Sequence, residues 1–171
     1  QNLETTHKQY MQVIKGKTAT LFASACEVGG IISDADDTLV NALQLYGQAL
    51  GISFQMVDDF LDYAGDKSDL GKNIGDDFRE KKITLPIIFS LQNDNNDNHK
   101  FWKRTLAKGE QDVSDFETAQ KLLRKDGSLE KTRQEALAWA EIAKSQLALL
   151  PKGEFNRMLL DLTDFVVARV N

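Results

Sequence analysis

Proline is almost absent from this chain, and that scarcity limits the possible folds more than any other feature. Two prolines occur among 171 residues, whereas average usage near 5% would give about nine. Proline interrupts a helix because it lacks the N–H donor and its ring clashes with the preceding turn. Apolar residues recur at helical spacing, and no sustained alternation of apolar and polar residues marks a strand. The sequence therefore predicts an all-α fold.

The apolar pattern predicts a series of helices separated by polar breaks. The first runs from about His7 to Ile32 and is weakened at Gly16, and a long second helix covers roughly Asp37 to Tyr63. Between them, residues 33–36 offer N-cap chemistry. Residues 64–82 are rich in Gly, Asp and Lys and are interpreted as a long functional loop. Further helices are expected from Pro86, over Phe101–Lys108, Ser114–Arg124 and Leu129–Leu150, and after a break at Pro151–Gly153, with a surface loop at Asn93–Asn98.

Length, charge and cysteine content narrow the class of protein. A chain of 171 residues is expected to form one domain. Its net charge of −5 argues against a general nucleic-acid-binding protein, which would carry a basic surface stripe. No apolar run approaches the roughly 20 residues of a membrane span. The single cysteine, Cys26, excludes an internal disulfide and fits a reducing, cytoplasmic compartment.

An aspartate cluster in the long second helix is the main candidate for chemistry. Asp58 and Asp62 share one helix face, with Asp59 beside them. Such carboxylates repel one another, and their hard oxygen atoms suit Mg²⁺. A solvated acidic face is the simpler explanation of an isolated DDxxD pattern. These carboxylates, however, interrupt an apolar helix between Val57 and Leu61, which favours a metal site.

Lysines accompany the acidic cluster. Residues 58–80 contain eight acids and three basic residues, and an anion bound through a metal needs both charges. Lys72 lies in the glycine-bracketed segment GKNIG, and Lys82 ends EKK before ITLP. Lys17 directly follows Gly16 within the first helix, where a weakened turn would free backbone carbonyls. Lysine suits diphosphate as a compact point charge, although a solvated surface residue is the simpler explanation of any one of these lysines taken alone.

Together these motifs resemble those of the trans-isoprenyl diphosphate synthases, the polyprenyl synthetase family. The matching segments, in the same order and spacing, are KTATLF (17–22), FQMVDDFLD (54–62), LGKNIGDDFREKKITLP (70–86) and LDLTDFVVARV (160–170). The last is most like bacterial long-chain members of the octaprenyl and decaprenyl type, which make quinone side-chain precursors. The resemblance covers essentially the whole chain. It implies that residues 1–171 are the C-terminal part of a single all-α domain, half of an isoprenoid-synthase helical bundle.

The activity that the resemblance implies is a Mg²⁺-dependent, head-to-tail condensation of isopentenyl diphosphate with an allylic prenyl diphosphate. It implies a homodimer. Asp58, Asp59 and Asp62 match the family's second aspartate-rich motif, in which Asp58 is the direct Mg²⁺ ligand and the others act largely through water. Asp77 matches an outer-shell acid of the third metal. Phe54 matches a residue beside isopentenyl diphosphate.

The resemblance also implies roles in holding the allylic substrate. Lys17 and Lys72 match lysines that hold its diphosphate, and Lys82 matches a lysine of the flexible loop that closes over it. Thr18 and Gln55 match residues whose oxygens lie near the carbocation. With Lys17, these two residues form the expected catalytic set.

The chain departs from the family pattern in ways that leave alternatives open. Family members are roughly twice as long, and no first aspartate-rich motif precedes Lys17, so we expect this chain alone to be inactive. Lys81 stands where the family's loop usually has glycine. A non-catalytic or regulatory subunit of a heteromeric synthase is the main alternative, although the intact carboxylates and lysines speak against it. An unrelated helical interaction module would leave the spacing of Asp58 and Asp62 coincidental.

Overall fold

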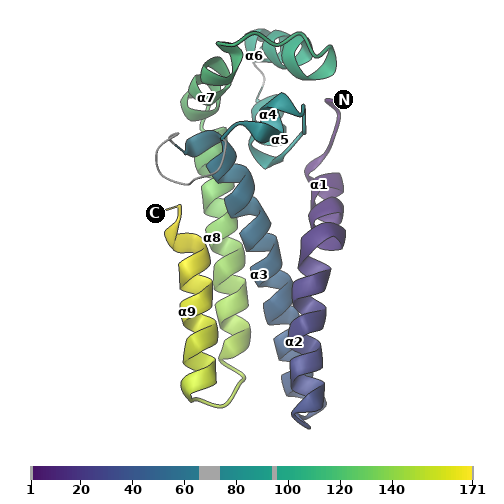
Figure 1. Ribbon diagram of the computed structural model, residues 1–171, viewed down its shortest axis with the longest axis vertical. Helices are drawn as coiled ribbons and strands as arrows, with labels where there is room; N and C mark the ends of the chain where they lie inside the picture. The colour runs from purple at the N-terminus through teal and green to yellow at the C-terminus, as the bar shows by residue number, and fades with distance from the viewer. Residues whose placement is uncertain (1, 66–73, 94–95, 171) are drawn as a thin grey trace. The chain divides into compact units, whose positions relative to one another are not determined.

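The computed structural model of the chain describes residues 2–65, 74–93 and 96–170, and all its regular elements are helical (Figure 1). No strand occurs in these ranges, which confirms the all-α prediction. None of the described helices is long and apolar enough to cross a membrane. The elements are α1 (His7–Ile14), η1 (Lys15–Ala19), α2 (Thr20–Ile32), α3 (Asp37–Ala64), α4 (Asp76–Arg79), α5 (Leu85–Gln92), α6 (Asn96–Trp102), η2 (Lys103–Ala107), α7 (Asp115–Lys125), α8 (Ser128–Leu147) and α9 (Glu154–Ala168).

Local chemistry explains where the predicted helices begin and change pitch. The Asp36 carboxylate accepts the backbone N–H of Leu39 at 3.0 Å, which caps the start of α3 as expected. Pro86 lies in the first turn of α5, where its missing N–H costs nothing. The expected weak turn after Gly16 is the π-helical segment η1. There the Thr20 hydroxyl donates to the carbonyl of Lys15 at 2.8 Å.

Three boundaries differ from the sequence-based expectation. The expected loop over residues 64–82 contains the short helix α4. The expected surface loop over residues 93–98 already contains the start of α6, because Asn98 is buried and donates to Asp126 at 3.3 Å. Helix α8 ends at Leu147 instead of Leu150, where the Asn156 amide donates to the Leu147 carbonyl at 2.9 Å.

The chain divides into two compact units. Unit 1 comprises Gln1–Tyr10 and Asp58–Arg133, and unit 2 comprises Met11–Val57 and Gln134–Asn171. Unit 1 is built around the fully buried Trp102, whose indole N–H donates to the Ser90 hydroxyl at 2.9 Å. The buried residues of its core are Tyr63, Phe78, Ile87, Trp102, Leu106, Ala119, Leu123 and Leu129.

Unit 2 is held together by close helix packing around the N-terminal part of α3. Gly47 and Gly51 allow α2 and η1 to approach closely, since a side chain at either position would overlap Phe22 or Ala19. The Ser53 hydroxyl of α3 donates to the Ala136 carbonyl of α8 at 2.8 Å. Helices α8 and α9 lie side by side (Figure 1) and are joined by an ion pair between Lys144 and Asp164 at 2.7 Å.

Two helices of unit 2 expose apolar faces. On α2, Leu21 and Ile32 are 72% and 77% exposed, and Val28 and Ile31 share this exposure. On α9, Phe155 is 81% exposed. Met158, Leu162 and Phe165 continue that face at helical spacing. Contiguous exposed apolar residues of this kind mark surfaces that contact another polypeptide or ligand.

Candidate functional site

The aspartate cluster occupies the last turns of α3, in unit 1. Asp58 is half-buried, whereas Asp59 is only 3% exposed. The Tyr10 hydroxyl donates to Asp59 Oδ2 at 2.6 Å. A charged carboxylate is rarely buried without such partners, so this contact helps to hold Asp59 in place.

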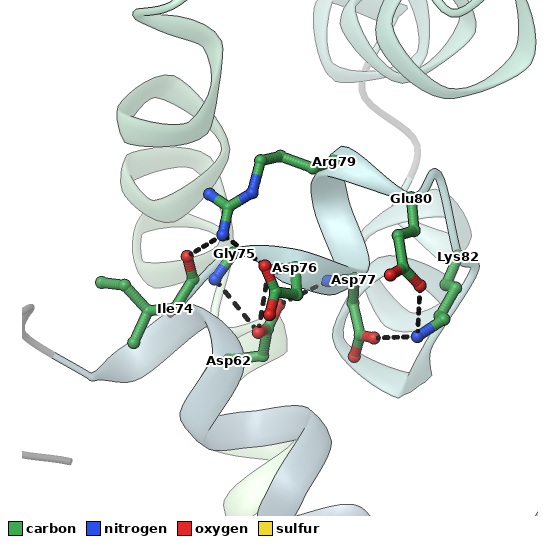
Figure 2. A network of polar contacts seen from close by, with 8 residues as sticks. All are labelled: Asp62, Ile74, Gly75, Asp76, Asp77, Arg79, Glu80 and Lys82. Atoms are coloured by element: carbon green, nitrogen blue, oxygen red, sulfur yellow. Dashed lines mark hydrogen bonds and ion pairs between the residues drawn. The ribbon is translucent and has the colours of Figure 1, made fainter. Parts of the chain in front are cut away.

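Asp62 lies one turn beyond Asp58 and accepts hydrogen bonds from the backbone of a later segment (Figure 2). Its Oδ1 accepts the N–H groups of Gly75 and Asp76 at 3.0 and 3.1 Å. Its Oδ2 accepts the N–H of Asp77 at 3.1 Å. These bonds satisfy donors at the start of α4 that have no partner within the helix, and they explain why a helix forms in a segment without apolar periodicity.

Burial, and after it the neighbouring carboxylate of Asp77, raise the pKa of Asp62 to about 6. The hydrogen bonds from the backbone of residues 75–77 act in the opposite direction, because they stabilise the charged form. The half-buried Asp62 thus keeps an affinity for a proton that a solvent-exposed aspartate lacks.

Lys82 is linked to the same turn. Its ammonium lies 3.1 Å from Asp77 Oδ1 and 2.7 Å from the Glu80 carboxylate (Figure 2). Hydrogen bonds from Lys82 to Glu80 and Asp77 raise the pKa of the lysine above its usual value. The Lys82 side chain is 49% exposed, so its charge can still reach a ligand. Asp62, Asp77 and Lys82 therefore form one connected network.

Lys81 adopts a backbone conformation that normally belongs to glycine. Its φ is +61°, in the left-handed region that L-residues with a Cβ occupy only at a cost. The resemblance implies a glycine at this position, and the positive φ gives the physical reason, because glycine adopts this conformation without strain.

Thr18 and Gln55 are brought together in unit 2, as the predicted catalytic pair requires. The Thr18 hydroxyl donates to Gln55 Oε1 at 3.1 Å across the contact between η1 and α3. Phe54 lies next to Phe22, with ring centroids 5.7 Å apart. Lys17, from the same turn as Thr18, is exposed.

The remaining predicted residue, Lys72, lies outside the described residues. Two contributors to the network were missed by sequence reasoning. Tyr10 belongs to the apolar stripe of the first helix, and nothing local indicates that its hydroxyl contacts Asp59. Gly75 has φ of +80°, and the glycine-bracketed segment GKNIG was the one signal that could have singled it out.

The described residues contain no group of three or more His, Cys, Asp or Glu side chains arranged to hold a metal ion. Asp62 directs both oxygens at backbone N–H groups, and Asp59 accepts the Tyr10 hydroxyl. Asp58, half-buried one turn before Asp62, is the third carboxylate of the motif. Its oxygens fit Mg²⁺, which usually takes one or two protein carboxylates together with water and substrate phosphates.

The all-helical architecture agrees with a comparison against known families. The sequence model of the polyprenyl synthetase family matches residues 1–123, and the chain belongs to this family.

The similar proteins are prenyl diphosphate synthases. Geranylgeranyl diphosphate synthase of Saccharolobus solfataricus is 41% identical over 98% of this chain and 51% of its own length. The crystal structure of a decaprenyl diphosphate synthase from Rhodobacter capsulatus superimposes with a TM-score of 0.93 at 50% identity, over 99% of this chain and 52% of that one.

A polyprenyl synthase from Caulobacter crescentus, complexed with calcium and isoprenyl diphosphate, superimposes with a TM-score of 0.92 at 39% identity, over 98% of this chain and 51% of that one. A divalent metal and an isoprenyl diphosphate are thus present in a related structure. This chain spans about half the length of the curated relatives that it matches.

Proposed function

We propose that the chain is the C-terminal half of a cytoplasmic, Mg²⁺-dependent trans-polyprenyl diphosphate synthase. The complete protein would condense isopentenyl diphosphate with an allylic prenyl diphosphate, and the product would serve as a precursor of quinone side chains. The observation that carries the proposal is the network at the end of α3, in which the Asp62 carboxylate is joined to a turn bearing Asp77 and Lys82. It joins a cation to the aspartate-rich end of α3 within one compact unit.

Asp58 is the proposed protein ligand of the metal, with Asp59 in support. Asp59 is buried and bonded to Tyr10, so it would contribute charge without moving. When bound, Mg²⁺ would neutralise the negative charge that develops on the departing diphosphate.

Lys82 is proposed to bind the diphosphate of the allylic substrate together with Lys17 and Lys72. Its raised pKa keeps the ammonium charged at neutral pH. Its ion pairs with Asp77 and Glu80 hold it near the turn, while its partial exposure leaves it free to exchange a carboxylate for a phosphate oxygen. Asp77 would then hold the lysine in place, acting on the substrate through Lys82.

Thr18 and Gln55 are proposed to stabilise the allylic carbocation through their oxygens. Because the Thr18 hydroxyl donates a hydrogen bond to Gln55 Oε1, the lone pairs of the Thr18 oxygen stay available to an electron-poor carbon. Phe54 and Phe22 supply an apolar wall beside them. Such a wall would exclude water until the cation meets the double bond of isopentenyl diphosphate.

We further propose that units 1 and 2 belong to one domain whose remaining helices come from the other half of the protein. The exposed faces of α2 and α9 support this, because large residues such as Ile32 and Phe155 are more than three-quarters exposed. The other half would also supply the first aspartate-rich motif and, in a homodimer, contacts to the second subunit.

The test uses the complete synthase that contains this chain. We expect Mg²⁺-dependent incorporation of labelled isopentenyl diphosphate onto an allylic primer, and a loss of most of this rate in Asp58→Ala. Asp161→Ala is the matched control, because Asp161 is an exposed carboxylate on α9. Unchanged turnover in Asp58→Ala would refute the metal assignment.

The 171-residue chain alone is expected to show no turnover, since it carries one of the two aspartate-rich motifs. Turnover by the isolated chain would refute this part of the proposal. Activity of the complete protein only after addition of a different polypeptide would favour the alternative of a heteromeric synthase.

A further inference from the structure

Both carboxylate oxygens of Asp62 accept hydrogen bonds from the backbone of a later segment. Oδ1 accepts two backbone N–H groups, from Gly75 and Asp76, and Oδ2 accepts the N–H of Asp77. A carboxylate offers about four lone-pair directions. Among the described residues, N–H groups therefore occupy three of these directions.

The turn that Asp62 holds is also anchored by Phe78, which is buried in the core of unit 1 and whose carbonyl accepts the Gln111 amide at 2.8 Å. Helix α4 is four residues long, far below the length at which a helix is stable by itself. Gly75 must adopt its positive φ, and a Cβ at this position would lie 2.7 Å from the Phe116 ring. The guanidinium of Arg79 braces the turn through the Ile74 carbonyl at 2.8 Å and through Asp76 at 2.6 Å (Figure 2).

The same turn positions the Asp77 carboxylate and the Lys82 ammonium. The backbone N–H of Lys82 donates to the Asp77 carbonyl at 2.8 Å, and its ammonium reaches the Asp77 carboxylate. The positions of the Asp77 and Lys82 side chains therefore depend on where the backbone of residues 75–77 is held. These residues are tied to α3 through the Asp62 carboxylate and through the bond from the Gly75 N–H to the Asp62 carbonyl at 3.0 Å.

We infer that Asp62 is a positioning residue whose carboxylate fixes the turn bearing Asp77 and Lys82 beside the end of α3, and that it does not bind the metal. Its importance for catalysis rests on the proposed function above, whereas its structural role does not. Within DDxxD, the first aspartate would then serve the metal, and the last would orient a diphosphate-binding lysine.

The first test measures amide hydrogen exchange in the 171-residue chain. Asp62→Ala is expected to speed exchange at Asp76 and Asp77 by about tenfold or more, since bonds to a charged acceptor are lost. Gly75 should change less, because its N–H keeps the Asp62 carbonyl as an acceptor. Asp58→Ala, which removes the neighbouring carboxylate, should leave these three amides unchanged. Equal protection in Asp62→Ala and wild type would overturn the inference, whatever the activity of the complete protein.

Two further variants keep this test decisive. Asp76→Asn removes a carboxylate from the same turn but keeps its backbone N–H, so protection should persist. Asp62→Asn retains an Oδ1 acceptor for Gly75 and Asp76 and loses the acceptor for Asp77. Exchange should therefore rise mainly at Asp77. If Asp62→Ala does not fold, this site-specific pattern carries the test, and a uniform change at all three amides would contradict the inference.

The second test uses the complete synthase and separates a positioning role from a ligand role. Asp62→Ala should raise the KM for the allylic diphosphate about tenfold, because Lys82 is misplaced, with the Mg²⁺ concentration for half-maximal rate unchanged. Asp62→Asn should lie between Asp62→Ala and wild type. A Mg²⁺ requirement raised as much as in Asp58→Ala would identify Asp62 as a ligand and refute the inference. If wild type shows no turnover, the proposed function fails and the exchange result still stands.

Discussion

The contact between η1 and α3 offers a sharp test of how the Thr18–Gln55 pair is assembled. At Gly51 the two backbones approach so closely that an added Cβ would lie 2.7 Å from the Ala19 Cα and 3.2 Å from the Phe22 Cβ. Non-bonded carbon atoms prefer about 3.5–4.0 Å. Gly51→Ala must therefore separate the helices locally by roughly 1 Å, which would also lengthen the 3.1 Å bond between Thr18 and Gln55.

The expected cost follows from two opposing effects. Overpacking of this kind lowers the free energy of unfolding by about 1–3 kcal/mol. Replacing a helical glycine by alanine raises it by about 0.5–1 kcal/mol. We expect Gly51→Ala to lower the free energy of unfolding by about 1–2 kcal/mol. Gly29→Ala is the control, because its Cβ would meet nothing within 4 Å. It should raise the free energy of unfolding by about 0.5–1 kcal/mol.

Urea unfolding of the 171-residue chain, followed by circular dichroism, measures both changes. With a slope near 2 kcal/mol/M, the midpoint should fall by about 0.5–1 M for Gly51→Ala and rise by about 0.3–0.5 M for Gly29→Ala. A Gly51→Ala chain as stable as wild type would mean that α3 and η1 are not in backbone contact there. In the complete synthase, the same variant should reduce kcat through the displaced Thr18.

Three further expectations concern unit 1. Tyr10→Phe should destabilise the chain by about 1–3 kcal/mol, because the buried Asp59 loses a short O–H donor, and an unchanged thermal midpoint would contradict this. Arg104 holds the pKa of Asp115 below its usual value, so the pair stabilises the fold above about pH 4 and less as the pH falls through the depressed pKa. Asp115→Asn should therefore lower Tm at pH 7, and the gap to wild type should narrow as the pH falls through the lowered pKa of Asp115; a constant gap would refute this expectation. Lys81→Gly should leave the free energy of unfolding unchanged or raise it by up to about 1 kcal/mol, since the φ of +61° at this position suits glycine. Lys81→Val should lower it, and chemical unfolding of the two variants measures the difference.

Much of the fold could be anticipated because its causes are local. The cap at Asp36, the weak turn after Gly16 and the first-turn proline of α5 depend on residues within a few positions of one another. The spacing of Asp58 and Asp62 on one helix face follows from helical geometry alone. Family membership likewise follows from motifs whose order and spacing are written in the chain.

The arrangement of the site depended on contacts that local patterns do not encode. Helix α4 was missed because its start is held by Asp62, which lies 13 to 15 residues earlier in the sequence. The hydroxyl of Tyr10 reaches Asp59 across 49 residues. Hydrogen bonds between distant segments depend on where folding brings each group, and neither propensity nor periodicity carries that information.

The sequence by itself therefore determined the helical class, the long helix α3 with its aspartates, and which lysines are candidates for binding diphosphate. Only the tertiary structure decided how those side chains are used. It turned the Asp62 oxygens towards the backbone of residues 75–77 and joined Lys82 to Asp77. The physical reason is that a carboxylate serves equally well as metal ligand, ion-pair partner or helix cap, and the donors that surround it in the folded chain select among these roles.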